Sequence, residues 1–313
     1  MPNTLPGQST VDSSLPSDQT PSTPSRPVLL AVLAHPDDET FGMGGTLALY
    51  SRRGVDTYLI CATRGEVGDV DPELLRGYDS IADRRVAELR CAAGHLGLTD
   101  IFFLNYRDSG MPGSADNHHP QAFVAQPREQ VALEIARLIR QLKPTVVVTS
   151  DPIGGYRHPD HIAVHQATVR AFQLAGDVTA ANMDGKPPHI PARLYYLTFP
   201  RQLMRLVMRV MRIFGRDVHK FGKNKDIDLA AIVDVDFPTN AVIDYRAVAD
   251  IRDDAAQCHA SQMSGSFPTG FIGWLRRIFA SKEIYMQAVP PPNGKVERDL
   301  FEDLVELPPL RRI

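Results

Sequence analysis

The 313-residue sequence has few cysteines, namely Cys61, Cys91 and Cys258. Three cysteines so far apart exclude a disulfide framework and a cysteine-rich zinc site, because both need several thiols at characteristic spacings. Cys61 ends an apolar, strand-like run, and Cys91 lies in an apolar pattern with helical spacing. Cysteine in such surroundings usually acts as a small hydrophobic residue, so we expect buried thiols.

The sequence also lacks long apolar runs and a strong net charge. No stretch approaches the roughly 20 apolar residues that a membrane-spanning helix needs. The formal net charge of -3 argues against a general nucleic-acid-binding protein. Residues 1–26 are rich in Ser, Thr, Pro and Asp without an apolar segment, so we expect a disordered tail and no secretory signal. The composition is typical of a cytoplasmic enzyme.

Strand-like and helical patterns alternate after residue 26. We expect strands at 28–33, 55–62, 101–104, 145–149, 194–197 and 231–235, and helices at 80–95, at 128–142 and after 159. This alternation favours right-handed βαβ units and a parallel sheet. The predicted fold is α/β, a Rossmann-like three-layer sandwich with a mainly parallel sheet and a C-terminal α/β appendage. We expect one domain over 27–290 and a C-terminal tail over 291–313.

Two His-Pro-Asp clusters follow two of the expected strands. The first, His-Pro-Asp-Asp-Glu at 35–39, comes directly after the strand at 28–33. The second, His-Pro-Asp-His at 158–161, follows the strand at 145–149. Because ligands of open α/β sheets bind where strands reach their carboxyl ends, we expect the clusters to meet. The sequence therefore predicts a metal site at this edge. The glycines at 42, 44 and 45 do not have the spacing of a dinucleotide fingerprint.

The residue types of the two clusters suit a hydrolytic zinc site. Such sites usually hold zinc with three His, Asp or Glu side chains and leave one position for water. A nearby carboxylate can take the proton of that water, and a further histidine can stabilise developing charge. His35 and Asp38 lie three residues apart across a strand-to-helix turn, so both side chains can face one point. Asp37, between them, can then face the water.

The sequence resembles the LmbE-like, or PIG-L, family of zinc-dependent N-deacetylases, which remove acetate from N-acetylglucosaminyl conjugates. The first family motif matches 34–39 together with Gly-Gly-Thr at 44–46, and the second matches 154–161. Lesser elements match 63–68 and 259–262, so the resemblance spans roughly residues 28 to 262. The paired His-Pro-Asp motifs are its specific part.

The resemblance implies roles for seven residues of these motifs. The expected zinc ligands are His35, Asp38 and His161, the expected general base is Asp37, and the groups expected around the oxyanion are Tyr156, His158 and Asp160. In this scheme His158 stabilises the oxyanion or acts as a protonated acid, and Asp160 tunes His158. Fe²⁺ is the alternative to Zn²⁺ in a site of this type.

Four further residues are expected to bind substrate, again only through the resemblance. They are Arg64, Glu66, Arg84 and His259. Arg84 has a structural alternative, because an ion pair with Glu88 at i, i+4 would use the same guanidinium.

A basic stripe marks the segment at about 201–225 as a helical insertion. The arginines recur at helical spacing, at positions 201, 205, 209, 212 and 216, beside apolar residues. A basic amphipathic helix can lie on an anionic membrane. An ordinary surface helix packed on the sheet is the alternative that we favour, so peripheral membrane contact is the lesser hypothesis.

The predicted function is zinc-dependent removal of acetate from an N-acetylglucosamine-type conjugate, a small-molecule substrate. One alternative is an amidase that cleaves a larger thiol- or sugar-conjugate amide. Another is a non-catalytic sugar- or lipid-binding module, but binding alone does not require a base such as Asp37. We expect no nucleic-acid partner and leave a homo-oligomer open.

Overall fold

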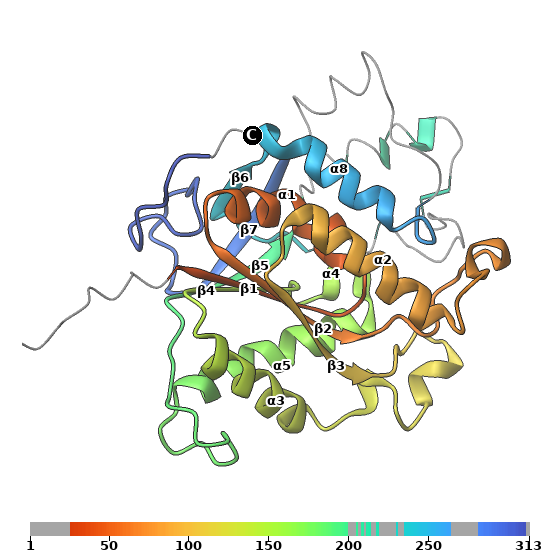
Figure 1. The fold of residues 1–313 in the computed structure, drawn as a ribbon, viewed down its shortest axis with the longest axis horizontal. Helices are drawn as coiled ribbons and strands as arrows, with labels where there is room; N and C mark the ends of the chain where they lie inside the picture. The colour runs from red at the N-terminus through yellow and green to blue at the C-terminus, as the bar shows by residue number, and fades with distance from the viewer. Residues whose placement is uncertain are drawn as a thin grey trace, which may run out of the picture.

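The computed structural model describes residues 26–199, 235–263 and 281–310, together with 205, 208, 209, 211–213, 217, 218 and 230. Within these residues one sheet is covered by helices on both faces (Figure 1). Its strands are β1 Val28–Leu33, β2 Asp56–Thr63, β3 Asp100–Tyr106, β4 Val146–Thr149, β5 Arg193–Thr198, β6 Ala241–Asp244 and β7 Lys282–Val289. The α-helices are α1 Asp38–Arg52, α2 Ile81–Leu96, α3 Arg128–Leu142, α4 Gly154–Arg157, α5 Pro159–Gly176 and α8 Ala249–Cys258. Short 3-10 helices are η1 Pro72–Leu75, η2 Ala115–His118, η3 Phe123–Ala125 and η4 Arg246–Val248.

The strand order of the sheet is β3-β2-β1-β4-β5-β7-β6. The five strands from β3 to β5 are parallel, and β7 runs antiparallel to both β5 and β6. The mainly parallel α/β fold predicted from the sequence is confirmed. The C-terminal part is not a separate appendage, because β6 and β7 extend the same sheet.

The interior strand β1 is apolar throughout because both of its faces are covered. Leu29, Ala31 and Leu33 pack in the core beneath α1, α2 and α8. Leu30 and Val32 alternate with them and pack in the second core, against α3 and α5. Figure 1 shows these two helical layers on opposite faces of the sheet.

Most predicted elements appear within a residue or two of their expected bounds, including the helix at 128–142 and the first five strands. Residues 1–25 and all but the last residue of the expected strand at 231–235 lie outside the described residues. So does most of the insertion at 201–225. Of its arginines, Arg205 pairs with Asp236 at 2.9 Å on the surface. The insertion and its possible membrane contact therefore stay predictions.

The prediction that Cys61 and Cys91 are buried thiols was wrong for Cys91. Cys91 on α2 and Cys258 at the end of α8 form a disulfide, although 167 residues separate them. Cys61 is the buried free thiol that was expected. Cys91 lies on an exposed side of its helix, where the neighbouring helix α8 brings Cys258 to it. Helical periodicity alone does not show which helices become neighbours.

The predicted C-terminal tail is also corrected by the structure. Leu300 and Phe301 are fully buried in the core beside α1, and the Phe301 ring packs edge-on against Tyr50 at 5.1 Å between centroids. Glu297 forms a buried ion pair with Arg193 of β5 at 2.6 Å. Residues 297–301 are therefore part of the domain.

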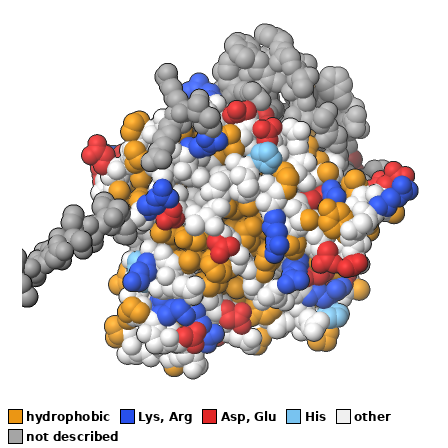
Figure 2. All heavy atoms as spheres, viewed as in Figure 1, with side chains coloured by type: hydrophobic (Ala, Val, Ile, Leu, Met, Phe, Trp, Pro, Cys, Tyr) orange, Lys and Arg blue, Asp and Glu red, His pale blue; other side chains and the backbone are white. Residues whose placement is uncertain are grey.

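The face of the molecule shown in Figure 2 carries basic and acidic side chains interspersed, without a large patch of one sign on its described part. Within the described residues, no helix combines the length and the apolar character required to cross a bilayer.

The packing of Phe301 yields a test of the domain boundary. Phe301→Ala should lower the free energy of unfolding by about 3–5 kcal/mol, because it leaves a cavity in the core. Val305→Ala is the matched control, since Val305 is 42% exposed and should change stability by no more than about 0.5 kcal/mol. Urea unfolding of the two variants measures both values. Equal stability of the two would mean that this segment is not part of the core.

Candidate active site

The candidate site lies where β1 and β4 end side by side. The two strands pair in parallel from Leu29 opposite Val146 to Val32 opposite Thr149. The turn after β1 carries His35 into the start of α1, and the loop after β4 leads through α4 to the start of α5. The two His-Pro-Asp clusters therefore meet at one edge, as the sequence predicts.

The three expected metal ligands converge on one point. His161 Nε2 lies 3.2 Å from His35 Nδ1 and 3.2 Å from Asp38 Oδ1, and His35 Nδ1 lies 3.7 Å from Asp38 Oδ2. A tetrahedral zinc ion with bonds of about 2.0–2.1 Å separates its ligand atoms by about 3.3–3.4 Å. The spacing and the donor types thus fit a divalent metal.

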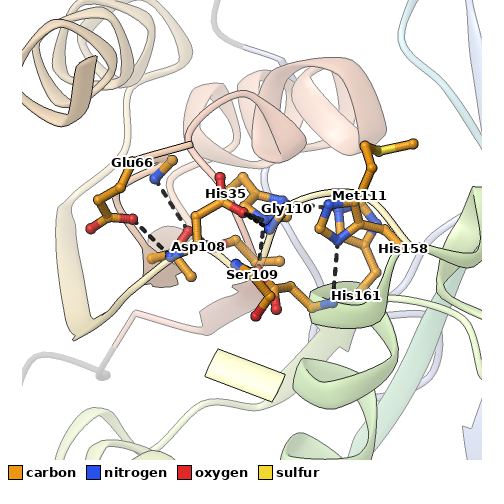
Figure 3. A network of polar contacts seen from close by, with 12 residues as sticks. His35, Glu66, Asp108, Ser109, Gly110, Met111, His158 and His161 are labelled. Carbon is orange, nitrogen blue, oxygen red and sulfur yellow. Dashed lines mark hydrogen bonds and ion pairs between the residues drawn. The ribbon is translucent and has the colours of Figure 1, made fainter. Parts of the chain in front are cut away.

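The opposite nitrogen of the His35 ring faces carboxylates. Its Nε2 lies 3.5 Å from Asp108 Oδ1 (Figure 3). The same nitrogen lies 3.2 Å from Asp160 Oδ2. Asp160 Oδ2 also accepts the Ser109 backbone N–H at 2.9 Å. A proton on Nε2 leaves the Nδ1 lone pair available for a metal, the arrangement common for ligating histidines. The Asp160 carboxylate thus supports His35 and does not tune His158 as expected.

Other combinations of ligand atoms are also close together. The rings of His35, His158 and His161 can place one nitrogen each within 4.8 Å of one another, and His35, Asp108 and Asp160 form a similar group. His158 Nδ1, however, accepts the Asp160 backbone N–H at 3.2 Å, which leaves only Nε2 of that ring for other contacts. Asp38, whose Oδ1 lies 3.2 Å from His161 Nε2, adds the carboxylate that the three-imidazole group lacks.

The two adjacent carboxylates differ in pKa. Burial raises the pKa of Asp37 to about 6, although Arg85 acts in the opposite direction. For Asp38, burial also raises the pKa, but the nearby His161 and His35 outweigh it and hold the pKa well below its usual range. Asp38 therefore stays ionised, as a metal ligand must be, whereas the pKa of Asp37 lies in the range that suits a general base.

His158 and Tyr156 adjoin the same point from the second motif. Burial and the neighbouring His35 and His161 lower the pKa of His158 to about 2. The ring is therefore neutral, and since Nδ1 accepts a hydrogen bond, its proton is on Nε2. Of the two roles expected for His158, a neutral ring favours the donor to the oxyanion over the protonated acid. Burial raises the pKa of Tyr156, so its hydroxyl also remains a donor.

Two cavities of different character open on the cluster. The polar one has a volume of about 330 Å³ and is lined in part by His35, Asp37, Arg85, Asp108, His158 and Gln262. The other has a volume of about 190 Å³ and is largely apolar, with Leu33, Phe41, Leu197 and Phe199 among its residues. Asp37 and Tyr156 line both cavities, so they lie at the junction between them.

The structure brings only some of the expected substrate residues near the polar cavity. Glu66 supports its wall, because Glu66 Oε2 accepts the Asp108 backbone N–H at 2.9 Å. Arg64 is exposed and donates to Asn105, and Arg84 pairs with Glu88 at 2.8 Å, the structural alternative. His259 is fully buried and donates from Nε2 to Glu39 at 2.8 Å.

Sequence reasoning missed Asp108 and chose Arg84 over its neighbour Arg85. Arg85 donates from Nη2 to the Pro36 carbonyl at 2.7 Å and pairs with Asp37 at 3.2 Å. Asp108 follows β3, whose carboxyl end lies at the same edge of the sheet. A position directly after a strand was the feature of the sequence that could have identified Asp108 as a site residue. The sequence pattern does not show which of the adjacent Arg84 and Arg85 faces the site, because both lie near the start of the same helix.

The fold and the donor set define an α/β protein with a cluster of His and Asp side chains at its strand ends that fits a divalent metal. The chain belongs to the PIG-L family, whose model, PIG-L: GlcNAc-PI de-N-acetylase, matches residues 30–172. It is 37% identical over 296 residues to the 1D-myo-inositol 2-acetamido-2-deoxy-alpha-D-glucopyranoside deacetylase 2 of Catenulispora acidiphila, which covers 88% of this chain and 95% of that protein. The resemblance seen in the motifs is confirmed.

Solved structures share the fold at lower identity. The N,N'-diacetylchitobiose deacetylase of Pyrococcus horikoshii matches with a TM-score of 0.57 and 21% identity, over 83% of each chain. The 4-carboxy-2-hydroxymuconate hydratase of Pseudomonas putida matches with a TM-score of 0.56 and 17% identity, over 86% of this chain and 99% of that one. One fold thus serves two chemistries, so function must be argued from the site.

The ligand geometry predicts how metal content responds to substitution. His35→Ala, Asp38→Ala and His161→Ala should each lose most of about one equivalent of divalent metal, while His158→Ala should retain it. Elemental analysis after dialysis measures the content. If Asp38→Ala retained the metal and His158→Ala lost it, the metal would be held by the imidazoles of His35, His158 and His161 instead.

The raised pKa of Asp37 predicts the acid side of the pH profile. A general base acts when ionised, so kcat/KM should fall as the pH drops through about 6, the pKa that burial gives Asp37. Initial rates on one substrate from about pH 3 to 8 measure the pH at which kcat/KM falls. A fall near pH 3.8, the ordinary value, would show that burial does not control this carboxyl in the working enzyme.

Proposed function

We propose that the chain is a zinc-dependent N-deacetylase that removes acetate from an N-acetylglucosamine-type conjugate. The observation that carries the proposal is Asp37, a carboxyl with a raised pKa that faces a polar cavity beside three convergent ligand atoms. The name of the Catenulispora relative makes N-acetylglucosamine linked to inositol the first substrate to test.

Two imidazoles and one carboxylate form a donor set that suits zinc, and Fe²⁺ accepts the same set. The residues that would hold the ion are His35, Asp38 and His161. When bound, zinc polarises the amide carbonyl and lowers the pKa of a bound water.

The remaining groups supply proton transfer and orientation. Asp37 takes the proton of the attacking water and returns it to the amine as the carbon–nitrogen bond breaks. His158, through Nε2–H, and Tyr156, through its hydroxyl, donate to the oxyanion as the tetrahedral intermediate forms. Arg85 keeps Asp37 in place through their 3.2 Å ion pair.

The polar cavity is the proposed site of the sugar. Its volume of about 330 Å³ lies at the lower end of the range for small-molecule sites. Asp108, Arg85 and Gln262 offer both acceptors and donors to hydroxyl groups there. Arg64, Arg84 and His259 are less suited to this task, because none of them lines this cavity.

The apolar cavity supports a second candidate, an amidase that cleaves an amide with a larger acyl group. This cavity of about 190 Å³ adjoins Asp37 on the side of Phe41 and Leu197. An acyl chain longer than acetyl could extend into it from the amide carbon. The two candidates share the same chemistry and differ in the acyl group.

Release of the free carboxylic acid from purified, zinc-loaded protein tests both candidates. We expect acetate from N-acetylglucosaminyl-inositol, and Asp37→Asn should keep metal and fold while turnover falls by about 10²-fold or more. A higher kcat/KM for the N-butyryl analogue would favour the amidase. If Asp37→Asn turned over at the parent rate, Asp37 would not be the base.

A further inference from the structure

Two buried ionisable side chains beside the site have no part in the chemistry described above. Glu39 and His259 are both 0% exposed, and His259 Nε2 donates to Glu39 Oε1 at 2.8 Å. Burial of such a pair is costly unless its hydrogen bonds are satisfied. Neither residue lines the polar or the apolar cavity. Their contacts instead lead to the backbone of Asp37.

The peptide group between Pro36 and Asp37 is held at both of its polar atoms. Its carbonyl accepts from Arg85 Nη2 at 2.7 Å, and its N–H donates to Glu39 Oε2 at 2.9 Å. Asp37 itself has φ 127°, a region that residues with a side chain rarely adopt. Such a backbone persists only where its surroundings determine it. The two hydrogen bonds fix the plane from which the Asp37 side chain projects.

The Glu39 carboxylate is oriented by its other oxygen. Oε1 accepts from the Thr40 hydroxyl at 2.5 Å and from His259. Because a buried carboxylate needs donors around both oxygens, loss of His259 would leave Glu39 poorly compensated and free to turn away from the Asp37 N–H.

His259 is itself well anchored. It follows the last residue of α8, Cys258, which is bonded to Cys91 of α2. Two residues later, Ser261 donates from its backbone N–H and its hydroxyl to Glu88 of α2, at 2.9 and 2.5 Å. These links fix the end of α8 against α2, and His259 therefore reaches Glu39 from a rigid support.

We propose that Glu39 and His259 are positioning residues that hold Asp37 in the orientation a general base needs. The inference rests on the proposed function and assigns His259 a role other than substrate binding. A pair that acts only through Asp37 affects the chemical step, so its loss should lower kcat while KM and metal content stay unchanged.

His259→Gln and His259→Asn form a matched pair for the test. Both introduce an amide, but only the longer glutamine can place a donor where Nε2 lies. We expect His259→Asn to lower kcat by about 10- to 100-fold, the range for a misplaced reacting group, and His259→Gln to recover most of it. KM and zinc per chain should match the parent in both. If His259→Asn does not fold, Glu39→Gln, which retains one acceptor, should lower kcat by itself.

Combining His259→Asn with Asp37→Asn distinguishes a positioning role of His259 from any other role. Residues that act as a unit are non-additive, so His259→Asn should not slow the residual rate of Asp37→Asn further. His189→Asn is the control, because His189 makes a comparable bond to the Pro144 carbonyl at 2.8 Å, near the amino end of β4. It should leave kcat and KM unchanged.

Three outcomes would overturn the proposal. A raised KM with unchanged kcat would make His259 a substrate contact. Equal loss of rate in both backgrounds would show an effect that does not pass through Asp37. A parent-like rate in Asp37→Asn would remove the base itself, and that result, unlike the other two, contradicts the proposed function as well.

Discussion

The parallel pairing of β1 with β4 is the constraint on which the site depends. These strands are far apart in the sequence, yet their register places Val32 opposite Thr149, so both chains leave the sheet at the same edge. Beyond the ends of these strands, His35 and His161 face each other with ring nitrogens 3.2 Å apart. Parallel pairing of β2 with β1 and β3 brings the loop of Asp108 to the same edge. The buried apolar faces of β1 thus fix the ligand geometry.

Four carboxylates lie around this point, and each of them has different neighbours. Asp38 is ionised beside two imidazoles, Asp160 and Asp108 face the far side of His35, and Asp37 is paired with Arg85. A cation between the ligand atoms relieves the repulsion among these carboxylates. The divergent pKa values of Asp37 and Asp38 follow from burial and from which neighbours each faces. Adjacent residues of one type can therefore act as base and ligand.

The sequence was sufficient for the parallel core and for the convergence of the two motifs, because strand patterns and strand ends are local features. It was insufficient where a result depends on which distant elements touch. Cys91 and Cys258 meet only because α2 packs on α8, and Phe301 is buried only because the chain returns to α1. The partner of Asp160 was misassigned for the same reason. Sequence proximity suggested His158, whereas the fold presents His35.

The central claim is that one metal ion is held between the ends of β1 and β4. The most direct measurement is a crystal structure of the zinc-loaded protein with anomalous diffraction recorded on both sides of the zinc absorption edge. The account predicts one zinc-specific peak, bonded to His35 Nδ1, His161 Nε2 and an Asp38 oxygen. A peak on the other side of the His35 ring, between Asp108 and Asp160, or no peak at this edge of the sheet, would contradict it.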